Sequence, residues 1–239
     1  QLAAQILPWL NGSTHATRTV GEPLAPPRAA PSAFVPLFGK VARLVWRVEC
    51  NGVEHIPAAG AFILCPNHQS ALDHLWIAAC LSSSQLRRLT WVVKREAFES
   101  ALSRAVIQSL ARHAAIAIER DGDPEPALRQ SLRVLQAGQP LVIYPEGTRT
   151  LTGQLGEFQL GAAWLALATH APLVPVRIAG AFEIFKAGQR IPRVFDWQQR
   201  TRPRVRVTFA EPLSPPADAK GRAAELALTQ RLRAAIEQQ

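Results

Sequence analysis

The sequence lacks several features that identify common classes of protein. No run of 18 or more apolar residues appears, so we expect no transmembrane helix. The first residues also lack the basic start and apolar stretch of a signal peptide. Because the chain contains no methionine, not even an initiating one, we expect that it begins inside a longer or processed product.

Cysteine is scarce, and its spacing excludes two common uses. The three cysteines, Cys50, Cys65 and Cys80, lie fifteen residues apart, which fits neither a disulfide framework nor the Cys-x-x-Cys spacing of a zinc site. We therefore expect reduced, mostly buried, intracellular thiols. The chain also has no Gly-x-Ser-x-Gly elbow, no His/Cys cluster with metal spacing and no nucleotide P-loop, which weakens the serine-hydrolase, metal and nucleotide interpretations.

The chain is rich instead in positive charge. Its formal net charge is +9, and 23 of its 27 basic side chains are arginine, whose planar fork suits phosphate. Such a field attracts nucleic acid, anionic lipid or phosphorylated small molecules. Aromatic residues make up only 7% and no nucleic-acid motif appears, so we predict no nucleic-acid partner. A non-catalytic module that binds an anionic membrane or nucleic acid remains the alternative.

The pattern of apolar residues predicts the fold class. With 239 residues, 48% of them hydrophobic, the chain can fill one core. Short apolar runs alternate with helical patterns from Ala61 onward, which predicts an α/β domain with a mostly parallel or mixed central sheet flanked by helices. The expected strands are "AFILC", "LTWVV", "AAIAI", "PLVIY" and "PLVPVRI", with "RVRVTF" as an edge or one-sided strand. Expected helices follow Asp123 and span residues 218–237.

The N-terminal part divides into two segments. Residues 1–33 contain five prolines and little periodicity, so we expect a linker or extension before a single domain over 34–239. Apolar residues then recur at helical spacing over 37–48, with Lys40, Arg43 and Arg47 on another face. This amphipathic helix is either an ordinary helix with a solvated basic side or an interfacial helix on anionic lipid.

The stretch "NHQSALD", Asn67 to Asp73, begins just after the strand "AFILC". Positions five apart do not share a helical face, so we expect His68 before a helix, Ser70 at its N-cap and Asp73 as its third residue. The carboxylate could then fix the imidazole tautomer and leave the other ring nitrogen to take a proton. The same residues fit a helix capping box without any catalytic role, so both interpretations stay open.

A second candidate site is "IYPEGTRT", which follows the strand "PLVIY". Gly147 would let the backbone approach an anion, Thr148 adds a hydroxyl and an amide, and Arg149 suits a phosphate. Arg120, after "AIAI", could project toward the same face. Each of these arginines could equally be a solvated residue at a strand end.

Taken together and in order, these stretches resemble the glycerolipid acyltransferase family, the lysophosphatidic acid and glycerol-3-phosphate acyltransferases. "NHQSALD" is similar to its N-H-x-x-x-x-D block, "IAIERD" to its second block, "YPEGTRT" to its E-G-T-R block and "LVPVRI" to its V-P-V-x-I block. The chain departs from the family at Glu119, usually Asp, and at Gln159 of "FQLG", commonly Lys. The second departure leaves the acceptor open.

The resemblance implies transfer of a fatty acyl group from acyl-CoA or acyl carrier protein to the hydroxyl of a lysophospholipid, without metal or cofactor. The first acceptor it suggests is 1-acyl-glycerol-3-phosphate, giving phosphatidic acid; a lyso-aminolipid, another lysophospholipid or glycerol-3-phosphate are alternatives. His68 would be the base and Asp73 its orienter. The implied site for the acceptor phosphate consists of Arg120, Glu146, Gly147, Thr148 and Arg149.

Because these substrates are membrane lipids, the resemblance favours the interfacial interpretation of residues 37–48. The stretch 186–206, with seven basic residues and one acidic residue, is a second candidate lipid-facing surface. We therefore expect a cytoplasmic protein bound peripherally to the inner face of the cell membrane.

Overall fold

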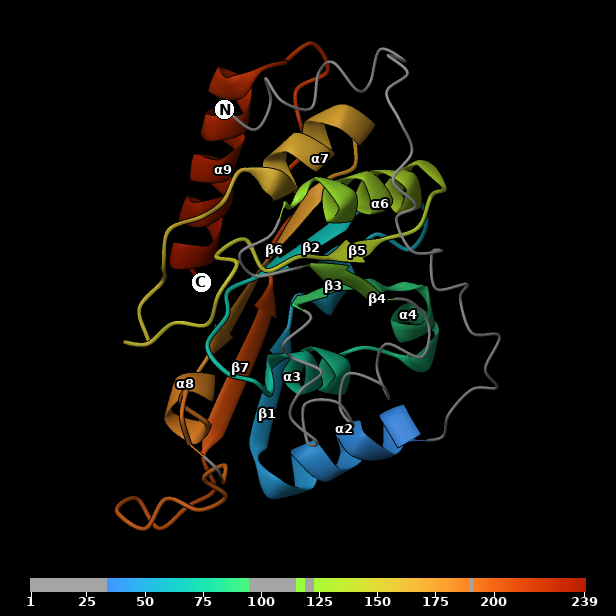
Figure 1. Cartoon of the computed structure of the whole chain (residues 1–239). Coiled ribbons are helices and arrows are strands. Elements are labelled where there is room, and N and C mark those ends of the chain that lie inside the picture. Colours follow the sequence, from blue (N-terminus) through green and yellow to red (C-terminus); the bar gives the residue numbers. More distant parts are fainter. Residues whose placement is uncertain (1–33, 95–114, 119–122, 190) are drawn as a thin grey trace.

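The computed structural model describes residues 34–94, 115–118, 123–189 and 191–239. Seven strands of these ranges form one sheet in the order β1-β7-β6-β2-β5-β3-β4 (Figure 1). Neighbouring strands are parallel except for β6 and β7, so the sheet is mixed and the predicted α/β class is confirmed. The strands are β1 (Arg47–Asn51), β2 (Ile63–Pro66), β3 (Thr90–Lys94), β4 (Ala115–Ile118), β5 (Leu141–Val142), β6 (Leu173–Ala179) and β7 (Arg204–Phe209).

Helices cover both faces of the sheet, as Figure 1 shows. The described helices are α2 (Phe34–Val45), the short 3-10 helix η1 (Val53–His55), α3 (Asp73–Cys80), α4 (Ser83–Arg88), α6 (Glu125–Gln136), α7 (Gly161–Thr169), α8 (Ala181–Ile184) and α9 (Arg222–Glu237). Successive side chains of the central strands point to opposite faces of the sheet and pack in two hydrophobic cores. Leu64 of β2 packs in one core with Trp76 of α3, whereas Ile63 packs in the other with Leu165 of α7. The site described below lies on the α3 side.

The predicted strands from "AFILC" to "PLVPVRI" are all present, and "RVRVTF" forms β7. It is one-sided as expected, since Val205 and Val207 are buried and Arg204 and Arg206 exposed, but it is not an edge strand. Strand β1 pairs with its outer side. The sequence interpretation missed β1 because its first two residues, Arg47 and Val48, were assigned to the preceding helix.

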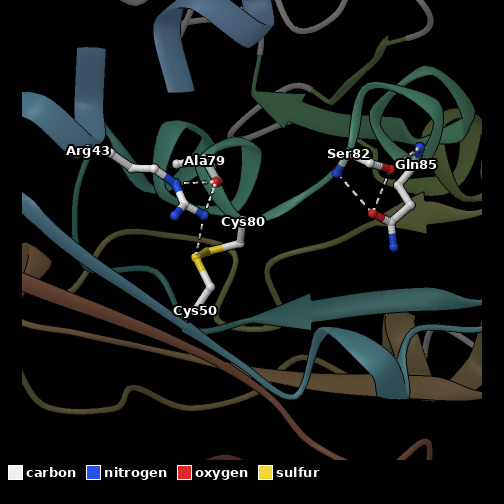
Figure 2. The surroundings of a disulfide bond; sticks show 6 residues. All are labelled: Arg43, Cys50, Ala79, Cys80, Ser82 and Gln85. Carbon is white, nitrogen blue, oxygen red and sulfur yellow. Dashed lines mark hydrogen bonds between the residues drawn. A yellow bond between two sulfur atoms is a disulfide. The ribbon is translucent and has the colours of Figure 1, made fainter. Parts of the chain in front are cut away.

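That helix, α2, lies three residues earlier than predicted: it ends at Val45, and Arg47 already pairs with β7. The predicted basic face is only partly on the helix, because Arg47 belongs to β1. Lys40 and Arg43 are both exposed on α2, and Arg43 donates from Nε and Nη2 to the carbonyl of Ala79 at 3.1 and 2.8 Å (Figure 2). Lys40 lies beside the exposed apolar side chains of Val41 and Leu44.

The cysteines differ from the prediction as well. Cys50 of β1 and Cys80 at the end of α3 form a disulfide with a Cα–Cα distance of 5.5 Å, and Nη2 of Arg43 lies 3.4 Å from Sγ of Cys50 (Figure 2). Cys65 is free and buried, and burial raises the pKa of its thiol. Equal sequence spacing gave no indication that the packing of α3 on β1 brings two of the three sulfurs together.

We expect one thiol, that of Cys65, to react in denaturant without reductant, and three after reduction. The double variant Cys50→Ser, Cys80→Ser should lose about 3 kcal/mol of unfolding free energy, because the unfolded chain is no longer closed into a loop. Denaturant titration of the wild type and the double variant measures this difference. As a control, reductant should leave the double variant unchanged, and three reactive thiols before reduction would contradict the disulfide.

Candidate active site

The candidate site lies where parallel strands β2, β5 and β6 end. In open α/β sheets, the carboxyl ends of the strands are where ligands bind. "NHQSALD" leaves the end of β2, and "YPEGTRT" follows β5, which pairs with β2. The side chain of Asn67 braces this edge: its Nδ2 donates to the carbonyl of Ile178 on β6 and its Oδ1 accepts from the same residue's N–H, at 3.0 and 2.6 Å.

His68 and Asp73, expected as a pair, are in contact. Nδ1 of His68 donates to Oδ2 of Asp73 at 2.8 Å, and their side chains are 16% and 0% exposed. This contact fixes which ring nitrogen carries the hydrogen and leaves Nε2 to exchange a proton with a substrate. The imidazole is therefore oriented by a buried carboxylate yet remains reachable from outside.

The same carboxylate oxygen also holds the backbone of the turn that leads into α3. Oδ2 of Asp73 accepts from the N–H groups of Gln69 and Ser70, at 2.7 and 2.9 Å. Ser70 in turn accepts from the N–H of Leu72 through Oγ, at 3.0 Å. The helix begins at Asp73 itself rather than after Ser70, because residues 71 and 72 form a turn. The side chain of Asp73 therefore does both things: it accepts from backbone N–H groups before the helix and it orients the imidazole of His68.

The peptide of His68 is held by residues of the second candidate loop. Its N–H donates to Oε1 of Glu146 at 2.7 Å, and its carbonyl accepts from the N–H of Thr150 at 2.9 Å. The sequence gave no sign of these contacts, because they join backbone groups to residues about 80 positions away. The two candidate constellations thus form one site.

Tyr144, which the sequence interpretation did not single out, packs on the imidazole. Its ring stacks on His68 with centroids 4.1 Å apart and an interplanar angle of 28°. Burial, and to a lesser extent the charge of Asp73, raise the pKa of Tyr144 well above its usual value, so its hydroxyl stays protonated. A possible signal in the sequence was that this is the chain's one tyrosine, directly before Pro145 and Glu146.

Among the predicted phosphate ligands, three lie in the turn after β5. Gly147 has a left-handed backbone, φ 67°, which glycine adopts without strain. Thr148 is exposed and Arg149 half-buried, and in the part of the chain that the structure describes the Arg149 guanidinium has no hydrogen-bond or ion-pair partner. Gln159, where the family commonly has Lys, lies over this turn, with its Cγ 3.7 Å from where a side chain on Gly147 would begin. Arg120 lies outside the described residues.

Within the described ranges, no group of three or more His, Cys, Asp and Glu side chains is placed to hold a metal ion.

Comparison with known proteins agrees with this geometry. The sequence model of the acyltransferase family matches residues 47–179, more than half of the chain and every residue of both constellations. The chain belongs to the acyltransferase family.

Named relatives of this acyltransferase chain come from bacteria, animals and plants. A probable 1-acyl-sn-glycerol-3-phosphate acyltransferase of Mycoplasma pneumoniae is 27% identical over 187 residues, 74% of this chain and 69% of the relative. The human 1-acyl-sn-glycerol-3-phosphate acyltransferase alpha is 31% identical over 131 residues, 54% of this chain and 44% of the relative. The chain thus spans about two thirds of the first relative and less than half of the second.

A solved structure shares the fold. The crystal structure of the 1-acyl-sn-glycerophosphate (LPA) acyltransferase PlsC from Thermotoga maritima matches with a TM-score of 0.63 and 24% identity, covering 86% of this chain and 76% of that one. The acyltransferase domain here therefore has a fold already seen in another protein.

The site of this acyltransferase contains a second, fully buried histidine. His74 packs against Trp91 and Tyr144, with ring centroids 5.1 Å apart in each case, and neither ring nitrogen has a partner among the described residues. Burial, and then the charge of His68, lower the pKa of His74 from 6.5 to about 3. His74 is therefore neutral at physiological pH.

We expect acid to destabilise the fold through His74. Below its unfolded pKa of 6.5 the unfolded chain binds a proton there, while the folded chain does not until about pH 3, so stability falls as the pH falls across this window. From pH 6.5 to about pH 5 the loss is about 2 kcal/mol. His74→Phe should remove it, seen as a smaller difference in Tm between about pH 7.5 and about pH 5.

The matched control is His170→Asn. His170 is exposed, and its left-handed backbone, φ 56°, suits asparagine. This control should keep the wild-type dependence of Tm on pH. An equal dependence in His74→Phe would show that His74 does not resist protonation in the fold.

Proposed function

We propose that the chain is an O-acyltransferase that moves a fatty acyl group from acyl-CoA or acyl carrier protein to the hydroxyl of 1-acyl-glycerol-3-phosphate, giving phosphatidic acid. The observation that carries the proposal is the His68–Asp73 contact at 2.8 Å, in a chain of the acyltransferase family whose Arg149 has no partner among the described residues. The choice of acceptor rests on the acceptor named for the relatives and on the chemistry of the arginine.

In the proposed step, Nε2 of His68 removes the proton of the acceptor hydroxyl as its oxygen attacks the thioester carbonyl. The carbon–oxygen bond forms and a tetrahedral intermediate collapses with loss of the thiolate, which takes the proton back from the imidazolium. Asp73 keeps the ring oriented and stabilises its transient positive charge. The step uses no metal or cofactor, since the base and the thioester supply the chemistry.

The acceptor phosphate would bind at the turn after β5. Arg149 can donate two parallel hydrogen bonds to phosphate oxygens, and the hydroxyl of Thr148 adds a donor on the same turn. The N–H of Gly147 already donates to the carbonyl of Tyr144, so Gly147 would contribute by letting the anion approach the backbone. We retain Arg120 in this site by its position after β4, as a proposal. Because His68 and this turn share hydrogen bonds, a phosphate held here places the neighbouring hydroxyl near the imidazole.

We expect thiol release from oleoyl-CoA that depends on lysophosphatidic acid, and a loss of about 10² to 10⁴ in kcat for His68→Ala, the range typical of a general base. Asp73→Asn should also lose activity, because the carboxylate that fixes the tautomer and orientation of the His68 imidazole is removed. His170→Asn, an exposed histidine outside the site, should remain fully active. If neither this acceptor nor other lysolipids elicit release, or if His68→Ala is as active as the parent, the proposed reaction is wrong.

We also propose that the protein binds peripherally to the inner face of a membrane, through residues 37–48 and 186–206. No described helix is long and apolar enough to cross a membrane. The two segments meet: Trp46 donates from Nε1 to the carbonyl of Arg193 at 2.7 Å, and Arg202 donates to the carbonyl of Leu44. Figure 1 shows α2 and the loop after α8 at the same end of the molecule.

The surface that these segments form, here called the docking surface, combines exposed apolar and basic side chains. Leu44 is 73% exposed, and Ile191 and Trp197 are 80% and 82% exposed. This composition suits the boundary between acyl chains and anionic head groups. The docking surface consists of Lys40, Val41, Leu44, Ile191, Val194, Trp197, Arg200 and Arg202.

The disulfide also bears on which side of the membrane the protein occupies. Stable disulfides are rare in cytosolic proteins, so the Cys50–Cys80 bond and a cytoplasmic placement favour different compartments. The thiol count on protein taken from its native source therefore tests the proposed location too.

Trp197→Ala should weaken sedimentation with vesicles of phosphatidylcholine and phosphatidylglycerol by about tenfold, because an apolar side chain leaves the interface. Leu44→Ser should act in the same direction. Leu226→Ser, on α9 and 44% exposed, serves as the matched control and should bind like the parent. If Trp197→Ala and Leu44→Ser bind the vesicles as tightly as the parent and Leu226→Ser do, these residues do not contact the membrane and the proposed docking surface is wrong.

A further inference from the structure

Glu146 uses both of its carboxylate oxygens within the fold. Oε1 accepts from the N–H of His68 and Oε2 from the N–H of Gly156, each at 2.7 Å. Its side chain is 7% exposed. The carboxylate therefore bridges the turn that carries the base and the loop that precedes α7.

The surroundings are shaped for this bridge. A side chain on Gly156 would begin 2.9 Å from Oε2 of Glu146, closer than real Cβ contacts, so the glycine makes room for the carboxylate. The carbonyl of His68 is held from the other side by the N–H of Thr150. The peptide of His68 is thus fixed at both its donor and its acceptor group.

A carboxylate so placed is poorly suited to hold a phosphate. Its acceptor positions are directed at backbone N–H groups, and its negative charge repels an anion. The pKa of Glu146 is raised, because the effect of burial outweighs the two backbone hydrogen bonds and the charge of His68, which lower it. The turn that would hold the phosphate has its own support, because the N–H of Gly147 donates to the carbonyl of Tyr144 and that of Gln159 to Pro145, at 3.0 and 2.8 Å.

We propose that Glu146 is a positioning residue that acts through the backbone of His68, and that it is not a ligand of the acceptor phosphate. This inference rests on the proposed acyl transfer and changes the role that the family resemblance implied for Glu146. Arg149 and Thr148 remain the phosphate ligands of that turn, and Gly147 lets the anion approach it. One loop then has two functions: its arginine binds the acceptor, and its glutamate places the base.

The test separates turnover from acceptor binding. Glu146→Gln keeps the shape but can offer an oxygen to only one of the two N–H groups, so we expect kcat to fall about 10- to 100-fold, the scale of a small misplacement of a catalytic group. The KM and Kd for lysophosphatidic acid should stay within about twofold. Arg149→Ala should show the opposite pattern, a raised KM and Kd.

Glu157→Gln is the matched control, since Glu157 is exposed and follows Gly156 in the same loop; it should behave like the parent. Gly156→Ala is a second variant, because the added methyl displaces the carboxylate, and it should reproduce the kcat defect if Glu146→Gln does not fold. Amide hydrogen exchange at His68 and Gly156, slow in the parent, should accelerate in Glu146→Gln.

A weaker Kd for lysophosphatidic acid with unchanged kcat in Glu146→Gln would overturn the inference and restore Glu146 to the phosphate site. Unchanged amide exchange at both positions would overturn it as well. Absence of transfer by the parent protein would instead refute the proposed function, and the exchange measurement would still decide whether Glu146 holds the peptide of His68.

Discussion

The geometry of the site depends on one buried atom, Oδ2 of Asp73. It receives hydrogen bonds from the imidazole of His68 and from two backbone N–H groups, and a buried carboxylate needs such donors because it has lost its water. The turn leaving β2, the base and the first residue of α3 therefore share a single anchor. Replacing this carboxylate would disturb the helix start and the ring orientation together.

The sequence predicted well those elements whose signal is local. The runs around Leu64, Val142 and Val174 are short, apolar and bounded by turns, and each became a central strand. The contact of His68 with Asp73 was equally accessible, because five residues at a strand-to-helix junction can meet without knowledge of the rest of the fold.

The failures share one physical cause, which is pairing over long distances in the sequence. Strand β1 forms because Arg47 to Asn51 pair with β7, about 157 residues later in the sequence. Without knowledge of that partner, the start of this strand looks like a continuation of the amphipathic helix. Cys80 meets Cys50 only when α3 packs on β1. The contact of Glu146 with the N–H of His68 was missed likewise, since a glutamate in an arginine-containing turn suggests a ligand site until the N–H of His68 is placed against it.

Helix α3 connects the candidate site to the docking surface. Its first residue, Asp73, orients the imidazole of His68, while at its other end Cys80 is bonded to β1 and the carbonyl of Ala79 accepts from Arg43 of α2. Gly39 of α2 packs so closely there that an added side chain would begin 3.4 Å from Cα of Ala79. Eight helical residues span about 12 Å. The exposed face of α2 is thus held at a short, fixed distance from His68, which suits the proposed transfer to an acceptor held in a lipid surface.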